Sequence, residues 1–182
     1  MEITWDEWYY NICVEMSKKS HCMSRQIGAI LVKDKSIIAQ GYNGPPRGIP
    51  HCNVRHQYDK LLLNEYHKHG LNISKESIVT KCPRQLLGFK SGEGLLWCCA
   101  GHAERNTLIN AARNGIVTKG AKLYMSCNIP CSPCMVEIIN AGIEEIIVIN
   151  LTSYDITAQY LLDNSNIKYR VFNHLKDKIN EK

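Results

Sequence analysis

The fold is decided by the segment from Ala121 to Phe172, AKLYMSCNIPCSPCMVEIINAGIEEIIVINLTSYDITAQYLLDNSNIKYRVF. Three short runs in it, AKLYMSC, EEIIVIN and IKYRVF, have the length and the β-branched or aromatic content of strands. Between them, residues 131–140 and 156–162 carry apolar side chains at helical spacing. Strands that alternate with helices require right-handed crossovers, so these three strands are predicted to run parallel in one sheet.

The residues upstream add the remaining layers. Apolar positions at helical spacing predict a helix from Trp5 that ends at about residues 17–20, and residues 27–42, IGAILVKDKSIIAQGY, predict a β-hairpin. Further helices are expected over residues 55–70 and over residues 102–114, the second closed by a glycine. The predicted fold class is α/β, a three-layer α/β/α sandwich around a mixed five-stranded sheet, with the hairpin as its antiparallel edge.

Composition limits the class of protein. The 182 residues, 45% hydrophobic and 21% charged, suit a single domain over residues 1–182 with a weakly patterned, cysteine-bearing insertion at about residues 52–98. No apolar run is long enough for a membrane span, and the acidic, aromatic start MEITWDEWYY is unlike a signal peptide, so a cytoplasmic location is expected. Nine cysteines in a reducing compartment indicate thiols or metal ligands. A net charge of +5 is compatible with an anionic ligand but small for a nucleic-acid track.

Two short motifs suggest a metal site. His102 and Glu104 form H-x-E at the start of one predicted helix, and PCSPC, which contains Cys131 and Cys134, opens the next. One imidazole and two thiolates supply three ligands for Zn²⁺ and leave a fourth position for water. Glu104 can face that position and carry a proton instead of binding the metal. The alternative is a closed structural zinc site with Glu104 on the surface, which would need a fourth Cys or His nearby.

These motifs resemble the signature of the zinc nucleobase deaminases, in which the glutamate is the general acid and base. Together with residues 25–52, residues 82–115 and the Tyr-Asp pair at 154–155, they resemble the cytidine and deoxycytidylate deaminase superfamily over about residues 17–172. The stretch GYNGPPRG, the insertion and Tyr154 are similar to its deoxycytidylate branch. The resemblance implies a hydrolase that converts dCMP to dUMP and ammonia, which supplies dUMP for thymidylate synthesis.

Two stretches depart from the family pattern. CNIPC places Cys127 and Ile129 where the family usually has threonine and serine, and CCAG stands where Cys-Pro-Ala or Cys-Arg-Gly is usual. A backbone carbonyl can accept from the exocyclic amine of cytosine whatever the side chain is. The departures therefore bear on pyrimidine selectivity more than on catalysis.

The resemblance also implies residues that bind the substrate, namely Asn43, Arg25, Tyr154 and Ala103. Asn43 would hold the sugar hydroxyl, although an Asn-Gly turn explains it equally well. Arg25 and Tyr154 would lie near the 5′-phosphate and the deoxyribose, and a lone arginine is otherwise a surface residue.

Regulation is a further implication of the resemblance. A homohexamer activated by dCTP and inhibited by dTTP, each bound with Mg²⁺, would use an allosteric site that includes Gly41, Asn43, Gly44, Gly48 and Arg113. Glycines let phosphates approach the backbone closely. A last-turn arginine such as Arg113 is also favoured simply by the helix dipole.

Other cysteines form a second group. The resemblance places Cys22, Cys52, Cys82 and Cys98 where similar proteins hold a structural zinc that would clip the insertion to the body. The alternative is that they are buried apolar thiols. The remaining three, Cys13, Cys99 and Cys127, are assigned to the core.

Three rival functions share some of these features. A polynucleotide or tRNA nucleobase deaminase would need exposed aromatics and a basic groove, and a free-cytidine deaminase would lack the last helix crossover. A zinc-binding module without activity would have Glu104 facing solvent or a fourth protein ligand. Charge and motifs favour a small nucleotide substrate, with neither nucleic acid nor a membrane as partner.

Overall fold

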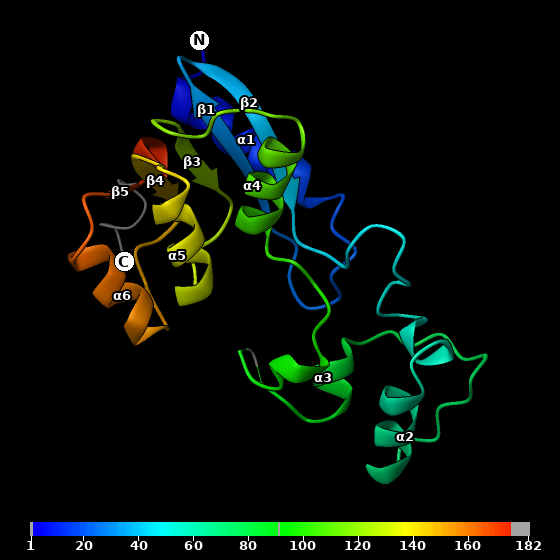
Figure 1. Ribbon diagram of the computed structural model, residues 1–182. Coiled ribbons are helices and arrows are strands. Elements are labelled where there is room, and N and C mark those ends of the chain that lie inside the picture. Colours follow the sequence, from blue (N-terminus) through cyan, green and yellow to red (C-terminus); the bar gives the residue numbers. More distant parts are fainter. Residues whose placement is uncertain (1, 91, 176–182) are drawn as a thin grey trace. The chain divides into compact units, whose positions relative to one another are not determined.

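The computed structural model describes residues 2–90 and 92–175 (Figure 1). The chain divides into two compact units, one of Met1–Ser20, Ile27–Asn43 and His102–Lys182, the other of His21–Gln26 and Gly44–Gly101. The insertion expected at about residues 52–98 lies inside the second unit. Within the described ranges, no helix is both long enough and apolar enough to cross a bilayer.

The first unit is built on a five-stranded sheet with the strand order β2-β1-β3-β4-β5. Strand β1 pairs antiparallel with both β2 and β3, whereas β3, β4 and β5 are parallel neighbours. The predicted mixed sheet with an antiparallel hairpin edge is therefore confirmed. The strands are β1 (Gly28–Lys33), β2 (Ser36–Tyr42), β3 (Lys122–Met125), β4 (Glu145–Val148) and β5 (Lys168–Val171).

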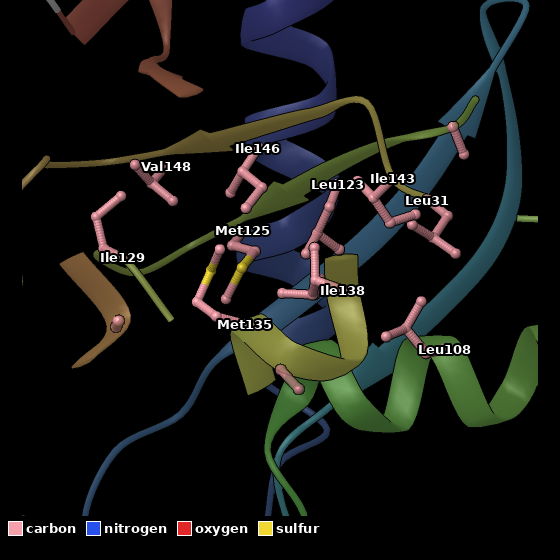
Figure 2. Packing of buried hydrophobic residues seen from close by; sticks show 14 of the residues in the cluster. Leu31, Leu108, Leu123, Met125, Ile129, Met135, Ile138, Ile143, Ile146 and Val148 are labelled. Carbon is pink, nitrogen blue, oxygen red and sulfur yellow. The ribbon is translucent and has the colours of Figure 1, made fainter. Parts of the chain in front are cut away.

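Helices cover both faces of this sheet. On one face lie α4 (Ala103–Arg113), α5 (Ser132–Asn140) and α6 (Ile156–Asp163), and on the other lies α1 (Trp5–Ser17). Alternate residues of the inner strands β1, β3 and β4 pack into the two layers, so these strands are largely apolar. Figure 2 shows the larger layer, whose labelled members include Leu31, Leu123, Met125, Met135 and Ile146. The smaller layer, under α1, holds Tyr9, Cys13, Ile30, Val32, Tyr124, Ile147 and Phe172.

Gly41 lets α4 lie close against β2. A Cβ at this position would be 2.6 Å from the backbone nitrogen of Thr107 and 3.0 Å from the carbonyl oxygen of Ala103. Thr107 in turn donates from Oγ1 to that carbonyl at 2.7 Å. The first turns of α4 are thus held against the hairpin, and this packing accounts for a glycine at position 41 within the strand.

The second unit contains α2 (Lys60–Lys68), α3 (Pro83–Leu86) and the 3₁₀ turns η1 (Arg55–Gln57) and η2 (Leu95–Trp97). The helix expected over residues 55–70 is wrong as one element, because Asp59 is extended and its carboxylate caps α2 by accepting from the N–H of Leu62. Helix α3 has four residues, too few to show a period in the sequence.

An ion-pair network joins α1 to the sheet in the first unit. Arg170 donates to both carboxylate oxygens of Asp6, at 2.6 and 3.0 Å, and through Nε to Glu145 at 2.8 Å. Burial alone would raise the pKa of Asp6, but hydrogen bonds from Arg170 and from the N–H of Asn173 outweigh it and lower the pKa. The pKa of Glu145 is lowered in the same way, with Lys122 and Arg170 opposing burial.

These lowered pKa values predict acid sensitivity. The stabilisation is complete above the unfolded-state pKa of about 4 and is lost as the pH falls through the lower folded-state pKa. Asp6→Asn is expected to lower the free energy of unfolding by about 2 kcal/mol at pH 7 and to flatten its decline below about pH 5. Urea unfolding at pH 7 and pH 3 measures both effects. Glu15→Gln, which alters an exposed ion pair with Lys18, is the control, and equal pH slopes for wild type and Asp6→Asn would contradict the prediction.

Candidate metal centre

Two helix N-termini carry the predicted metal ligands. His102 is the N-cap of α4 and Cys131 is the N-cap of α5, both with extended backbone angles, and Cys134 lies in the first turn of α5. Neither cap side chain makes a capping hydrogen bond. The unpaired N–H groups of a helix start give it a partial positive charge, which favours thiolates there.

The three donor atoms are spaced for one zinc ion. Nδ1 of His102 is 3.4 Å from Sγ of Cys131 and 3.3 Å from Sγ of Cys134, and the two sulfurs are 3.5 Å apart. Tetrahedral zinc, with bonds of about 2.0 Å to nitrogen and about 2.3 Å to sulfur, requires separations of roughly 3.5–3.8 Å. The donor set therefore fits zinc in both chemistry and spacing.

Glu104 completes the centre. Its carboxylate oxygen Oε1 lies 3.7 Å from Nδ1 of His102, and the residue is 4% exposed. His102, Glu104, Cys131 and Cys134 together offer ligand atoms within 4.8 Å of one another. A carboxylate in this position can exchange a proton with a molecule bound at the metal. An inactive zinc module would instead have this glutamate facing solvent, whereas Glu104 is buried.

Hydrogen bonds among the three predicted ligands shift their pKa values. Hydrogen bonding to Cys131 and to Glu104 raises the pKa of His102 to about 10. Hydrogen bonds from Cys134 and His102 lower the pKa of Cys131 to about 5, whereas hydrogen bonding to Cys131, together with burial, raises the pKa of Cys134. A metal ion that takes all three ligands displaces protons from His102 and Cys134, so its affinity rises with pH.

An ion pair that the sequence did not indicate connects α4 and α5, the two helices that carry the metal ligands. Arg105, next to Glu104 on α4, donates from Nε and Nη2 to the two carboxylate oxygens of Glu137 on α5, at 2.9 and 2.7 Å. Both side chains are about two-fifths exposed. The pair is bidentate and joins α4 to α5 at a partly exposed position.

The predicted substrate residues differ in their surroundings. Asn43 is buried, and its side-chain oxygen accepts from Oγ of Ser20 and from the N–H of Ile27, both at 2.8 Å, which ties the end of β2 to the start of β1. Tyr154 is 65% exposed and directly precedes the N-cap of α6. The methyl group of Ala103 is buried, so a contact with substrate would involve its backbone N–H at the first position of α4.

Arg25 belongs to the second unit and is exposed. Gly44 pairs with Gly101 through two backbone hydrogen bonds of 3.0 and 2.8 Å, and Gly48 has a positive φ of 76°. Arg113 is exposed in the last turn of α4, about 15 Å along the helix from its start. The substrate and regulatory roles of these residues stay predictions.

The second group of cysteines, Cys22, Cys52, Cys82 and Cys98, lies in the second unit, and its role in binding zinc stays a prediction. Among the described residues, no other three His, Cys, Asp or Glu side chains meet the spacing found at His102. Cys99 is wrongly assigned to the core, because it is half-buried and hydrogen bonds from Cys52 and from Arg55 lower its pKa to about 6. Hydrogen bonding to Cys99 and burial raise the pKa of Cys52, and the nearby Cys82 and Cys98 act in the same direction. Cys13 does lie in the core, where its thiol donates to the carbonyl of Tyr124.

The fold and the candidate metal centre agree with one protein family. The chain belongs to the family described as the cytidine and deoxycytidylate deaminase zinc-binding region, whose sequence model matches residues 3–150.

Curated relatives fall in the deoxycytidylate branch. The deoxycytidylate deaminase of Schizosaccharomyces pombe is 28% identical over 169 residues, 93% of this chain and 44% of the relative. That of Saccharomyces cerevisiae is 28% identical over 97% of this chain and 47% of the relative, so this chain spans about half the length of the fungal proteins. The deoxycytidylate deaminase of Mycobacterium phage D29 is 30% identical over 79% of this chain and 92% of the relative.

Solved structures share the fold. The dCMP deaminase from cyanophage S-TIM5 in complex with dCMP and dUMP aligns with a TM-score of 0.62 at 23% identity, covering 94% of this chain and 98% of that one. A bifunctional deaminase and reductase of Thermotoga maritima aligns with a TM-score of 0.55 at 18% identity over 38% of its length. This likeness bears out the mixed-sheet fold.

Proposed function

We propose that this protein is a zinc-dependent hydrolase that converts dCMP and water to dUMP and ammonia. The observation that carries the proposal is the buried carboxylate of Glu104 beside a three-ligand centre whose spacing fits zinc. The relatives named deoxycytidylate deaminase support dCMP as the substrate. The structural neighbour that holds dCMP and dUMP gives the same indication.

The roles of the residues follow from their positions. His102, Cys131 and Cys134 would hold zinc, which in a three-ligand site supplies hydroxide at neutral pH by lowering the pKa of water. Glu104 takes the proton that the attacking water loses and delivers it to N3 of cytosine. It then takes the proton of the new hydroxyl group at C4 and passes it to the amine. The C–N bond breaks as C4 becomes a carbonyl, so one water is consumed and one ammonia leaves. The helix N-termini at Ala103 and Ser132 favour the negative charge that develops.

The proposed nucleotide contacts keep the assignments made from the resemblance. Asn43 and Tyr154 would contact the deoxyribose, Ala103 the base through its backbone, and Arg25 the 5′-phosphate. We propose that the product serves thymidylate synthesis in the cytoplasm, a location supported by nine cysteines that are all free thiols.

The proposal includes regulation and a second zinc. A homohexamer would respond to dCTP as activator and dTTP as inhibitor, each with Mg²⁺, through Gly44, Gly48 and Arg113. Glycine backbones that admit phosphates support this assignment. A structural zinc in the second unit would take Cys22, Cys52, Cys82 and Cys98, and the fact that all four belong to this unit supports the assignment.

Ammonia release tests the proposed activity. With dCMP, dCTP, cytidine and adenosine assayed side by side, dCMP is expected to have the highest kcat/KM, about 100-fold above cytidine and adenosine, because a site that pairs a phosphate discriminates against substrates without one. Preference for adenosine would favour a tRNA-type deaminase instead. The dCMP assay is repeated with dCTP or dTTP and Mg²⁺, and unchanged hyperbolic curves would contradict only the regulatory part.

A further inference from the structure

The carboxylate of Asp155 joins two helix starts in the first unit. One oxygen, Oδ2, accepts from the backbone N–H of Ser132 at 2.7 Å, and the other, Oδ1, accepts from the N–H of Ala158 at 3.1 Å. Ser132 is the first residue of α5 and directly follows the metal ligand Cys131. Ala158 lies in the first turn of α6, of which Asp155 is the N-cap.

The hydrogen bond to Ser132 lies between the two cysteine ligands in the metal-binding turn. Between the ligands Cys131 and Cys134 stand Ser132 and Pro133, and proline has no N–H. The Ser132 N–H is therefore the one backbone donor between the two sulfur ligands. Its acceptor, the Asp155 carboxylate, fixes the orientation of the peptide bond between Cys131 and Ser132. That orientation determines where the Cys131 side chain points, and hence whether its sulfur reaches the metal centre.

The residues just before the metal-binding turn, Cys127 and Asn128, are hydrogen-bonded to the segment that follows β4. Ile149 donates its N–H to the carbonyl of Cys127 at 3.0 Å, and Asn128 donates from Nδ2 to Oγ1 of Thr152 at 3.2 Å. Ser153 donates from Oγ to the carbonyl of Asp155 at 3.0 Å. These bonds leave the Asp155 carboxylate little freedom to move away from Ser132.

We propose that Asp155 is a positioning residue for the zinc centre, holding Cys131 in its ligating geometry through the Ser132 N–H. This inference rests on the proposed zinc site. Groups that orient metal ligands without touching the metal typically change metal affinity 10–100-fold when removed. A carboxylate suits the task because its two oxygens each accept from a different helix start, Oδ2 from Ser132 of α5 and Oδ1 from Ala158 of α6.

A role as an ordinary helix cap makes a different prediction. Asparagine caps helices about as well as aspartate, so Asp155→Asn would then be silent. In Asp155, however, the two N–H groups are bound by different oxygens, and asparagine replaces one of these oxygens with an NH₂ group, which cannot accept a hydrogen bond. In this geometry either the N–H of Ala158 or the N–H of Ser132 loses its acceptor. The two roles therefore separate in Asp155→Asn, whereas Asp155→Ala removes both.

The experiment measures zinc release from the purified full chain into a chromogenic chelator, with melting temperature recorded at saturating zinc. Asp155→Asn is expected to release zinc from the catalytic centre about 10-fold faster than wild type, with a melting temperature within about 2 °C. Asp155→Ala should release zinc at least as fast and melt lower. Thr4→Ala is the matched control, because Thr4 caps α1 by accepting from the N–H of Glu7 and should affect stability alone.

The outcomes separate this inference from the proposed function. Faster release from Asp155→Asn, with dCMP deamination partly restored by excess zinc, supports the positioning role. Wild-type release rates in both Asp155 variants would overturn it and leave the zinc-dependent function intact. A wild-type chain that binds no zinc at the His102 centre would overturn both.

Discussion

Glu104→Gln is expected to reduce dCMP deamination by at least about a thousandfold while zinc stays bound. Glutamine has nearly the shape of glutamate but cannot take a proton from water and pass it to the base. The carboxylate is not needed to hold the metal, since His102, Cys131 and Cys134 already provide three ligands at suitable separations. Loss of turnover with retained metal is thus the signature of a proton carrier.

Elemental analysis and steady-state kinetics on the same samples measure this prediction. Glu137→Gln is the control, because it removes a carboxylate from the neighbouring ligand-bearing helix at a partly exposed ion pair, and turnover within a few-fold of wild type is expected. Substantial activity in Glu104→Gln would refute its assignment as general acid and base. The zinc content of wild type also reports on the second unit, where two ions per chain support the structural site and one counts against it.

The order of helices and strands in the first unit could be predicted because the inner strands β1, β3 and β4 are buried on both faces. Residues such as Leu123 and Ile146 face one helical layer, while Tyr124 and Ile147 face the other. Such strands appear in the sequence as short, continuous apolar runs. The metal ligands His102, Cys131 and Cys134 could be predicted for a different reason. A zinc site accepts few residue types as ligands and requires them at set spacings, so the motifs stand out in the sequence.

Other features depend on which elements pack together, and a single sequence does not carry that information. The bidentate pair of Arg105 and Glu137 forms because α4 and α5 lie side by side. Asp155 reaches Ser132 for the same reason, since the two are 23 positions apart in the sequence and meet where α5 and α6 pack together. In the second unit, the sequence does not show that Cys99 lies beside Cys52, because the two are far apart in a segment without helical or strand periodicity.

Gly28→Ala is expected to be the most destabilising single-methyl change, at about 3 kcal/mol. Gly28 begins β1 directly beneath α1, and a Cβ there would lie 2.1 Å from the carbonyl oxygen of Cys13, 2.8 Å from the nitrogen of Ser17 and 2.9 Å from Cβ of Met16. Two of these atoms are backbone, so no rotamer change relieves the clash. The strand cannot retreat either, because Gly28 exchanges hydrogen bonds with Ser126 through both its N–H and its carbonyl.

The methyl group can be accommodated only if α1 lifts from the sheet, which exposes part of the layer formed by Tyr9, Cys13 and Phe172. Urea unfolding of Gly28→Ala should show a midpoint shifted to lower denaturant and a melting temperature lower by about 10 °C. Gly44→Ala is the matched control, because a Cβ at Gly44 would have no atom within 4 Å. Its free energy of unfolding is expected to stay within about 0.5 kcal/mol of wild type. Equal stability of the two variants would mean that α1 does not approach β1 as closely as these contacts require.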